Sequence, residues 1–171
     1  GPCWYYMACE SAIEMAKLTG NEQDIPWFEE RMEGIRSTFQ EKFWKGDGYH
    51  SDMPNDDRAN AMAVLSGLAD PDYYPIILDV LQTVRNSTPY MEGYVLESMF
   101  MMGYPNEAME RMKLRYTDLV ANENSTLWED FYYLGTKNHA WSGGPLTMLN
   151  KYVAGIYPTT PGYETYRVQP N

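Results

Sequence analysis

The sequence divides into segments whose apolar residues recur with the 3.6-residue period of an α-helix. Seven such segments follow one another, separated by glycine, proline or capping residues. The expected helices cover residues 5–20, 26–44, 57–68, 72–84, 89–102, 106–119 and 146–156. This succession of helical segments predicts an all-α fold.

The helical segments alternate in character along the chain. The third and fifth are apolar on nearly all sides, whereas the second and sixth carry charged residues on one face. The first and seventh consist mainly of small or apolar residues, and the fourth resembles the amphipathic segments more weakly. We expect this alternation when helical hairpins form an inner and an outer layer. A plain helical bundle, in which most helices have one apolar face, is the alternative.

The inner helices would place their N-terminal ends on one common rim if they run parallel. The segments that lead into these ends are rich in aromatic or charged residues, and they cover residues 4–6, 56–58, 88–90 and 125–141. We therefore hypothesise that these four segments surround the mouth of one site.

The composition changes after residue 157. Turn residues are followed by the alternating Tyr166, Arg167 and Val168, which is typical of a short β-strand. A single strand is not stable alone, so it pairs within this chain or belongs to a further domain. We expect the second half of a helical catalytic domain over residues 1–157 and the start of a truncated C-terminal β-domain over residues 158–171.

Composition excludes several classes of partner. A net charge of −11 argues against binding to nucleic acid or to anionic membrane surfaces. No apolar run is long enough to cross a bilayer. Cys3 and Cys9 do not make a disulfide framework or a metal site, and without metal-ligand spacing or a phosphate loop we expect no cofactor. An aromatic content of 15% is compatible with sugar binding or with a tyrosine-rich helical core.

The segment from Ser125 to Trp141 lies between two helical patterns and is too irregular to be a helix throughout. It contains an acid, Glu129, an imidazole, His139, and two indole rings, those of Trp128 and Trp141. Such groups in a connecting segment favour a site for a polyol, because functional side chains often lie on loops. A long loop held by buried aromatic rings is the alternative interpretation.

Three motifs in this part of the chain occur in a fixed order. They are Thr126-Leu-Trp-Glu-Asp130, Asn138-His-Ala-Trp-Ser-Gly-Gly-Pro145 and Tyr152-Val-Ala-Gly-Ile-Tyr-Pro-Thr-Thr-Pro-Gly162. Together they closely resemble the end of the catalytic domain of α-L-rhamnosidases of glycoside hydrolase family 78. Residues 4–8, 57–68 and 88–97 resemble upstream parts of that domain. The resemblance implies the second half of an (α/α)6 toroid, with about seven helices in alternating inner and outer layers and a short C-terminal strand.

The resemblance also implies an inverting glycosidase acting on a rhamnose-containing carbohydrate. Glu129 occupies the position of the general base that activates water, and His139 that of a histidine that binds a sugar hydroxyl. An inverting reaction needs two carboxyl groups roughly 6.5–9.5 Å apart, with room between them for water. The base must be ionised, so neighbouring donors should keep the pKa of Glu129 low or near normal.

Other residues are expected around the same pocket. Trp141, Tyr90 and Tyr5 would shape it, whereas Trp128 is as easily a core residue as a pocket residue. Asp57 could contact a substrate hydroxyl, or it could cap the third helix.

The sequence departs from the family pattern at its upstream end. The family's general acid lies in a motif for which we find no match before residue 4. We therefore expect a fragment that is inactive alone and needs the rest of its own catalytic domain, or that forms a homodimer through its open inner face. Two alternatives are a toroid glycosidase with a different sugar specificity and a non-catalytic helical domain that binds carbohydrate or another partner.

Overall fold

The computed structural model describes residues 1–124 and 126–170 of the chain. Ser125, the first residue of the segment singled out above, and Asn171, the last of the chain, lie outside the described residues. The helices in the described part are α1 (Pro2–Thr19), α2 (Ile25–Phe43), α3 (Asp57–Leu65), α4 (Tyr74–Thr83), α5 (Pro89–Met101), α6 (Pro105–Ala121) and α7 (Gly144–Met148). Two strands follow, β1 (Ile156–Pro158) and β2 (Tyr166–Val168).

The helix ends follow the local signals in the sequence. The side chain of Asp56 accepts the backbone N–H of Arg58 at 2.9 Å and so caps α3. Proline is the first residue of α5, where its missing N–H costs no helical hydrogen bond. Gly20, with a φ of 71°, ends α1 in the left-handed conformation that glycine adopts most readily. The first six predicted helices are therefore confirmed, with small shifts at their ends.

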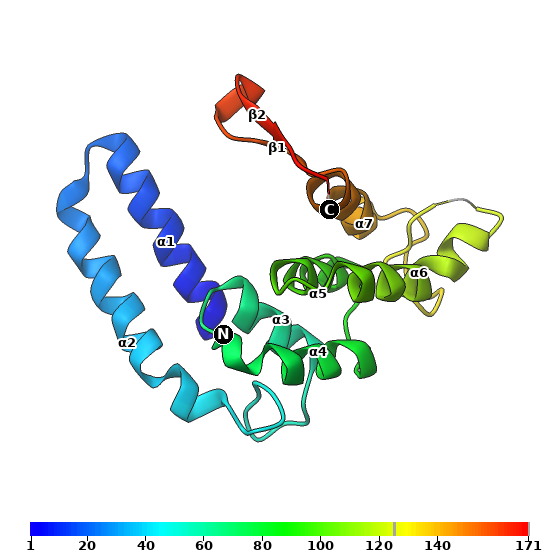
Figure 1. The fold of residues 1–171 in the computed structure, drawn as a ribbon, viewed down its shortest axis with the longest axis horizontal. Helices are drawn as coiled ribbons and strands as arrows, with labels where there is room; N and C mark the ends of the chain where they lie inside the picture. The colour runs from blue at the N-terminus through cyan, green and yellow to red at the C-terminus, as the bar shows by residue number, and fades with distance from the viewer. Residues whose placement is uncertain (125, 171) are drawn as a thin grey trace.

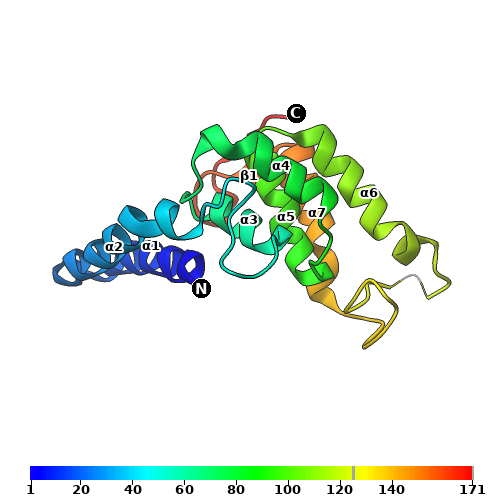
Figure 2. The same cartoon turned by 90° about the horizontal axis from the view of Figure 1, so that it is seen from below.

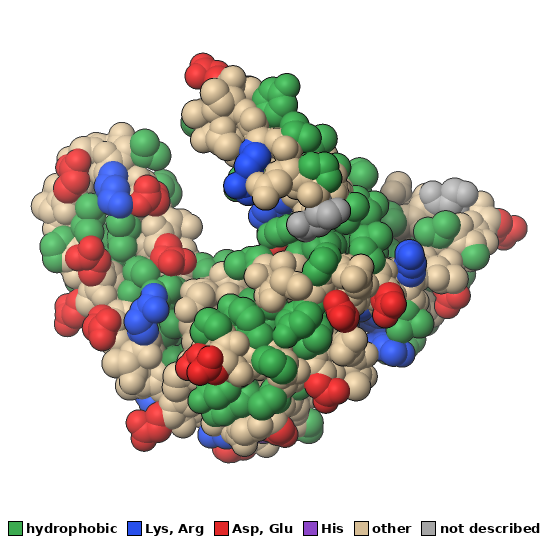
Figure 3. Space-filling model, viewed as in Figure 1, with side chains coloured by type: hydrophobic (Ala, Val, Ile, Leu, Met, Phe, Trp, Pro, Cys, Tyr) green, Lys and Arg blue, Asp and Glu red, His purple; other side chains and the backbone are tan. Residues whose placement is uncertain are grey.

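The helices follow an open arc that runs from the α1–α2 hairpin to α7 and the two strands (Figure 1). α1 packs on α2 and α3 on α4, while α5 contacts α3, α6 and α7. The loop that joins α6 to α7 lies at the opposite end of the molecule from the α1–α2 hairpin (Figure 2). The space-filling view shows a wide hollow between the α1–α2 hairpin and the C-terminal strands (Figure 3).

The alternation of buried and exposed helices is confirmed in the middle of the arc. α3 and α5 are buried over most of their length, whereas α2 has one fully buried side chain, that of Phe39. The two end helices are more exposed than the inner-layer prediction requires. Met148 is the one buried residue of α7, and α1 buries only one face. Within the described chain an end helix has an inner-layer neighbour on one side only, so its second side faces solvent.

The predicted seventh helix exists, but it ends before Ile156. α7 ends at Met148, continues as one π-helical turn over Leu149–Val153, and gives way to β1 at Ile156. The predicted C-terminal strand exists and pairs within the chain, because β2 runs antiparallel to β1 with Ile156 opposite Val168. This pairing joins both sides of the expected boundary after residue 157, and the division into two domains stays a prediction.

Candidate active site

The loop between α6 and α7 folds back on itself through backbone hydrogen bonds. The N–H of Glu129 donates to the carbonyl of Thr136 at 3.0 Å, and the N–H of His139 donates to the carbonyl of Leu127 at 2.8 Å. These two bonds bring side chains from both ends of the loop together. Glu129, Thr136 and His139 consequently form one cluster, which we call the Glu129 site.

The carboxylate of Glu129 is held by one neighbouring residue. Its Oε2 accepts the backbone N–H of Thr136 at 2.9 Å and the hydroxyl of Thr136 at 3.0 Å. These two donors hold the pKa of Glu129 below its usual range, the backbone N–H more strongly than the hydroxyl, because hydrogen bonds to the charged form favour it. Glu129 is therefore ionised near neutral pH, as a general base must be.

Gly135 lets the loop pass close to this carboxylate. Its φ is +63°, and a Cβ added there would lie 2.7 Å from Oε2 of Glu129. The next acidic residue, Asp130, has a different role, since its Oδ1 accepts the backbone N–H groups of Tyr132 and Leu134 and stabilises the turn.

The imidazole of His139 lies beside Glu129 and stacks on an indole. Its Nδ1 is 2.7 Å from the hydroxyl oxygen of Thr136 and 3.9 Å from Oε2 of Glu129. The ring stacks on Trp141, with centroids 3.9 Å apart and an angle of 23° between the planes. The side chains of His139 and Glu129 are 29% and 39% exposed, so both can reach a ligand.

A row of aromatic rings leads away from His139 across three helices or their ends. Trp141 contacts Tyr90 with centroids 5.3 Å apart, Tyr90 contacts Tyr94 at 5.6 Å, and Tyr94 contacts Trp4 at 5.4 Å. A cleft of about 390 Å³ between α5 and α7 is lined by Tyr90, Tyr94 and Trp141 among others. We call these four residues, Trp4, Tyr94, Tyr90 and Trp141, the aromatic row. Their partly exposed rings offer flat faces on which a sugar ring can stack.

The close packing of α5 on α7 beneath this cleft depends on two glycines. A Cβ added to Gly144 would lie 2.8 Å from the Cα of Gly93. Side chains larger than hydrogen would force these helices apart and move Trp141 away from Tyr90.

The structure brings together three of the residues expected at the pocket and separates the others. His139 lies beside Glu129, Trp141 stacks on His139, and Tyr90 contacts Trp141. Tyr5 is 46% exposed, but among the described residues its neighbour Trp4 is the one that belongs to the aromatic row, through its contact with Tyr94. Trp128 lies in the core, 3% exposed, where its ring contacts that of Tyr133 at 4.5 Å.

Asp57 does not join the Glu129 site, which corrects the expectation that it contacts substrate. It is fully buried, and its Oδ2 accepts Nη2 of Arg111 at 2.6 Å and the N–H of Ser87 at 3.3 Å. Arg111 also donates from Nε to Oε1 of Glu92 at 2.6 Å. A charge at a helix start looks the same in sequence whether it faces a ligand or a buried arginine.

This ion cluster, formed by Asp57, Glu92 and Arg111, reaches the loop between α6 and α7 through a second arginine. Nε of Arg115 lies 3.3 Å from Oε2 of Glu92, and its Cζ lies 3.9 Å above the ring of Phe131. Burial alone would lower the pKa of Arg111, but the hydrogen bonds and charges of Glu92 and Asp57 outweigh it and raise this pKa. Both carboxylates of the cluster are therefore balanced by guanidinium groups.

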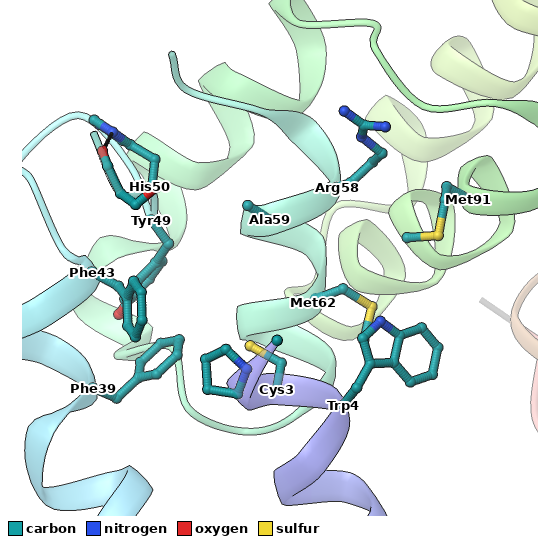
Figure 4. A pocket seen from close by; sticks show the side chains of 13 residues that line it. Cys3, Trp4, Phe39, Phe43, Tyr49, His50, Arg58, Ala59, Met62 and Met91 are labelled. Carbon is teal, nitrogen blue, oxygen red and sulfur yellow. Dashed lines mark hydrogen bonds between the residues drawn. The ribbon is translucent and has the colours of Figure 1, made fainter. Parts of the chain in front are cut away.

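Another cavity lies at the starts of α1, α3 and α5. It has a volume of about 330 Å³ and is lined largely by apolar side chains. Figure 4 shows Phe39, Phe43 and Tyr49 on one side of this cavity and Trp4 and Met91 on the other. Arg58, at the start of α3, also lines it. The cleft beside Trp141 lies at the starts of α5 and α7. Together the two cavities therefore support the prediction that the inner helices begin on one common rim.

The roles of Thr136 and Arg111 could not be recognised from the sequence. Nothing in the sequence distinguishes Thr136 from other loop threonines, because its partner Glu129 lies seven residues away on the returning part of the loop. Arg111 has the same appearance as the other basic residues of the amphipathic α6.

Comparison with known proteins identifies the family. The model of the bacterial α-L-rhamnosidase six-hairpin glycosidase domain matches residues 2–153. The chain belongs to this family. The match includes Glu129, His139 and Trp141, and it agrees with the all-α partial toroid described above. The family is one of glycoside hydrolases.

The same fold occurs in a solved rhamnosidase. The crystal structure of a glycoside hydrolase family 78 rhamnosidase from Bacillus sp. GL1 superposes with a TM-score of 0.83 at 18% sequence identity. The superposition covers 97% of this chain and 20% of that rhamnosidase, so the chain spans about a fifth of its length. No curated protein matches the chain. Within the described residues, no helix combines the length and apolar character needed to cross a membrane.

Proposed function

We propose that this chain carries the general base of an inverting α-L-rhamnosidase, with Glu129 as that base. The observation that carries the proposal is the state of this carboxylate. It is partly exposed and held by Thr136 beside His139, and neutral donors favour its ionised form. A carboxylate paired with a cation would be a weaker base toward water, because the cation stabilises the ionised form.

The reaction transfers one proton at Glu129. A water molecule gives this proton to the carboxylate while its oxygen bonds to the anomeric carbon of the sugar. The bond from that carbon to the leaving oxygen breaks, and the leaving oxygen receives a proton from a carboxylic acid. The water attacks the face opposite to the leaving group, so an α-glycoside gives a β-sugar first.

Neighbouring side chains supply binding and orientation in this proposal. His139 forms a hydrogen bond with a sugar hydroxyl, and the ring of Trp141 packs against an apolar sugar face. Tyr90 extends that face toward α5. The substrate is a carbohydrate that ends in α-L-rhamnose. A toroid glycosidase with another sugar specificity would use the same base, and a panel of aryl glycosides distinguishes the two.

The acid that completes the reaction lies elsewhere in this proposal. The nearby carboxylates have other partners, since Asp130 binds backbone N–H groups and Glu97 pairs with Lys151 at 2.6 Å. We propose that the general acid comes from a part of the catalytic domain outside these 171 residues. The chain alone would then hydrolyse no aryl rhamnoside, whether it is monomeric or pairs as a homodimer through its open inner face.

The decisive experiment compares Glu129→Gln with Glu123→Gln in the complete enzyme. Glu123 is an exposed acid six residues upstream, so its substitution matches the change in charge. We expect Glu129→Gln to lower kcat for an aryl α-L-rhamnoside by about 10²- to 10⁴-fold with little change in substrate binding, and Glu123→Gln to have no effect. Proton NMR should detect the β-anomer of rhamnose first. Wild-type turnover by Glu129→Gln, or an α-anomer as first product, would refute the proposal.

A further inference from the structure

Glu129 and His139 are neighbours without a direct hydrogen bond. The 3.9 Å between Nδ1 of His139 and Oε2 of Glu129 is too long for one. Thr136 lies between them, with its hydroxyl oxygen 3.0 Å from Oε2 and 2.7 Å from Nδ1. One residue thus contacts both groups on which the proposed function depends.

We propose that Thr136 is a positioning residue that joins Glu129 and His139 in a directed hydrogen-bond relay and leaves Oε1 of Glu129 to accept the proton of water. This inference rests on the proposed function, because it assigns roles to atoms of that site. Oε2 already accepts two hydrogen bonds from Thr136, whereas the described residues place no donor against Oε1. The lone pairs of Oε1 are therefore the ones open to a water molecule.

The direction of the relay follows from the number of protons. A hydroxyl has one proton to donate, and an ionised carboxylate can only accept. The proton of the Thr136 hydroxyl therefore points to Oε2, and its oxygen accepts a proton from Nδ1 of His139. The opposite direction would leave two acceptor oxygens facing each other at 3.0 Å without a proton between them.

This direction fixes the tautomer of His139. The neutral ring carries its proton on Nδ1, so Nε2 is an acceptor. Nε2 can then receive a hydrogen bond from a sugar hydroxyl, while the stack on Trp141 fixes the plane of the ring. Thr136 thus determines both which oxygen of Glu129 acts as base and which kind of sugar contact His139 can make.

The relay also has a definite effect on pH dependence. The charged or titratable groups around Glu129 are Asp130, from the same turn, and His139, from the other end of the loop. The Thr136 hydroxyl favours the ionised carboxylate, so its removal raises the pH at which Glu129 gains its proton. Activity should then disappear at a higher pH as the solution is acidified.

The test uses Thr136→Val and Thr136→Ser in the complete enzyme, with Thr117→Val as a matched control. Valine keeps the shape and the backbone N–H but removes the hydroxyl, and serine restores it. Thr117 is exposed on α6, where its hydroxyl bonds Lys113 of the same helix. We expect Thr136→Val to lower kcat by about 10- to 100-fold and to move the acidic limb of the pH profile upward. Thr136→Ser and Thr117→Val should retain both wild-type values.

A double substitution separates this inference from the proposed function. If Thr136 acts through Glu129, adding Thr136→Val to Glu129→Gln causes no further loss of kcat. Suppose that Thr136→Val leaves kcat and the acidic limb of the pH profile unchanged while Glu129→Gln is inactive. That result would overturn the role of Thr136 but not the role of Glu129 as general base. If Glu129→Gln were fully active, the proposal that Glu129 is the general base would instead be refuted. Thr136→Ala is the second variant if Thr136→Val does not fold, and the same shift is expected.

Discussion

The ion cluster and the Glu129 site hold their carboxylates in opposite ways. Asp57 and Glu92 are fully buried, and Arg111 binds both through short hydrogen bonds. Glu129 is 39% exposed, and its only protein donors among the described residues are the neutral N–H and hydroxyl of Thr136. The buried carboxylates are thus fully engaged in holding helices together, whereas Oε1 of the exposed one has no donor among the described residues.

This difference separates two uses of the same functional group. Forming a buried charge pair costs desolvation energy. Removing one partner destabilises the protein far more than replacing the whole pair by apolar residues, because it leaves the other charge buried and unpaired. The ion cluster therefore serves to hold α3, α5 and α6 in one arrangement. A general base must exchange a proton during each turnover, so neutral donors that leave one oxygen open suit it better than a salt bridge.

The largest expected effect comes from breaking the ion cluster. Arg111→Met would leave Asp57 and Glu92 buried without their main cation, and we expect a loss of about 3–5 kcal/mol in the free energy of unfolding. Lys17→Met is the control, because Lys17 pairs with Glu14 at 2.7 Å on the exposed face of α1. That surface pair should contribute less than about 1 kcal/mol. Urea denaturation measures both, and equal losses would show that burial does not distinguish them.

A smaller effect is expected where the backbone passes Glu129. Gly135→Ala would place a Cβ 2.7 Å from Oε2 and displace the carboxylate, so we expect a decrease of about tenfold in kcat. Gly67→Ala is a matched control, since Gly67 has a φ of +68° and nothing within 4 Å of an added Cβ. Both substitutions strain a left-handed residue and should lower the melting temperature alike. If both also lowered kcat equally, the contact with Glu129 would not matter.

The helices could be predicted from the sequence because their signals are local. Each signal lies within a few residues of the helix that it defines. The signals include the apolar period, the proline at the first position of α5 and the glycine after α1. The misplaced end of the seventh helix has a cause that is not local. Residues 149–156 keep a helical apolar pattern, but pairing of Ile156 with Val168 overrides it, and that partner lies twelve residues further along the chain.

The site could be predicted only in part, for the same reason. Glu129, His139 and Trp141 stand in recognisable motifs, whereas the role of Asp57 depends on Arg111, which is 54 residues away. Likewise, the role of Thr136 depends on how the loop returns to Glu129. Side chains whose function comes from a distant partner carry no mark of it in the sequence.

The smallest expected effect sharpens the comparison with a fourth carboxylate, Asp47. Its Oδ1 lies 2.8 Å from Nε2 of His50 in an exposed loop, with no hydroxyl between them. This direct hydrogen bond raises the pKa of His50 above its ordinary value of 6.5 and lowers that of Asp47. The contribution of the histidine to stability is therefore complete below pH 6.5 and is lost as the pH rises through its raised pKa. The contribution of Asp47 is lost instead when acid lowers the pH through its depressed pKa.

An NMR titration of the His50 imidazole tests this pair. We expect Asp47→Asn to return the pKa of His50 toward 6.5, and Asp52→Asn, an exposed acid of the same loop, to leave it unchanged. Stability should change little, because the pair is near the surface and solvent screens it. If Asp47→Asn left the titration unaltered, a direct carboxylate contact would have no more effect on an imidazole than distant charges do. The contrast between a cation-bound carboxylate and the threonine-held Glu129 would then lose its physical basis.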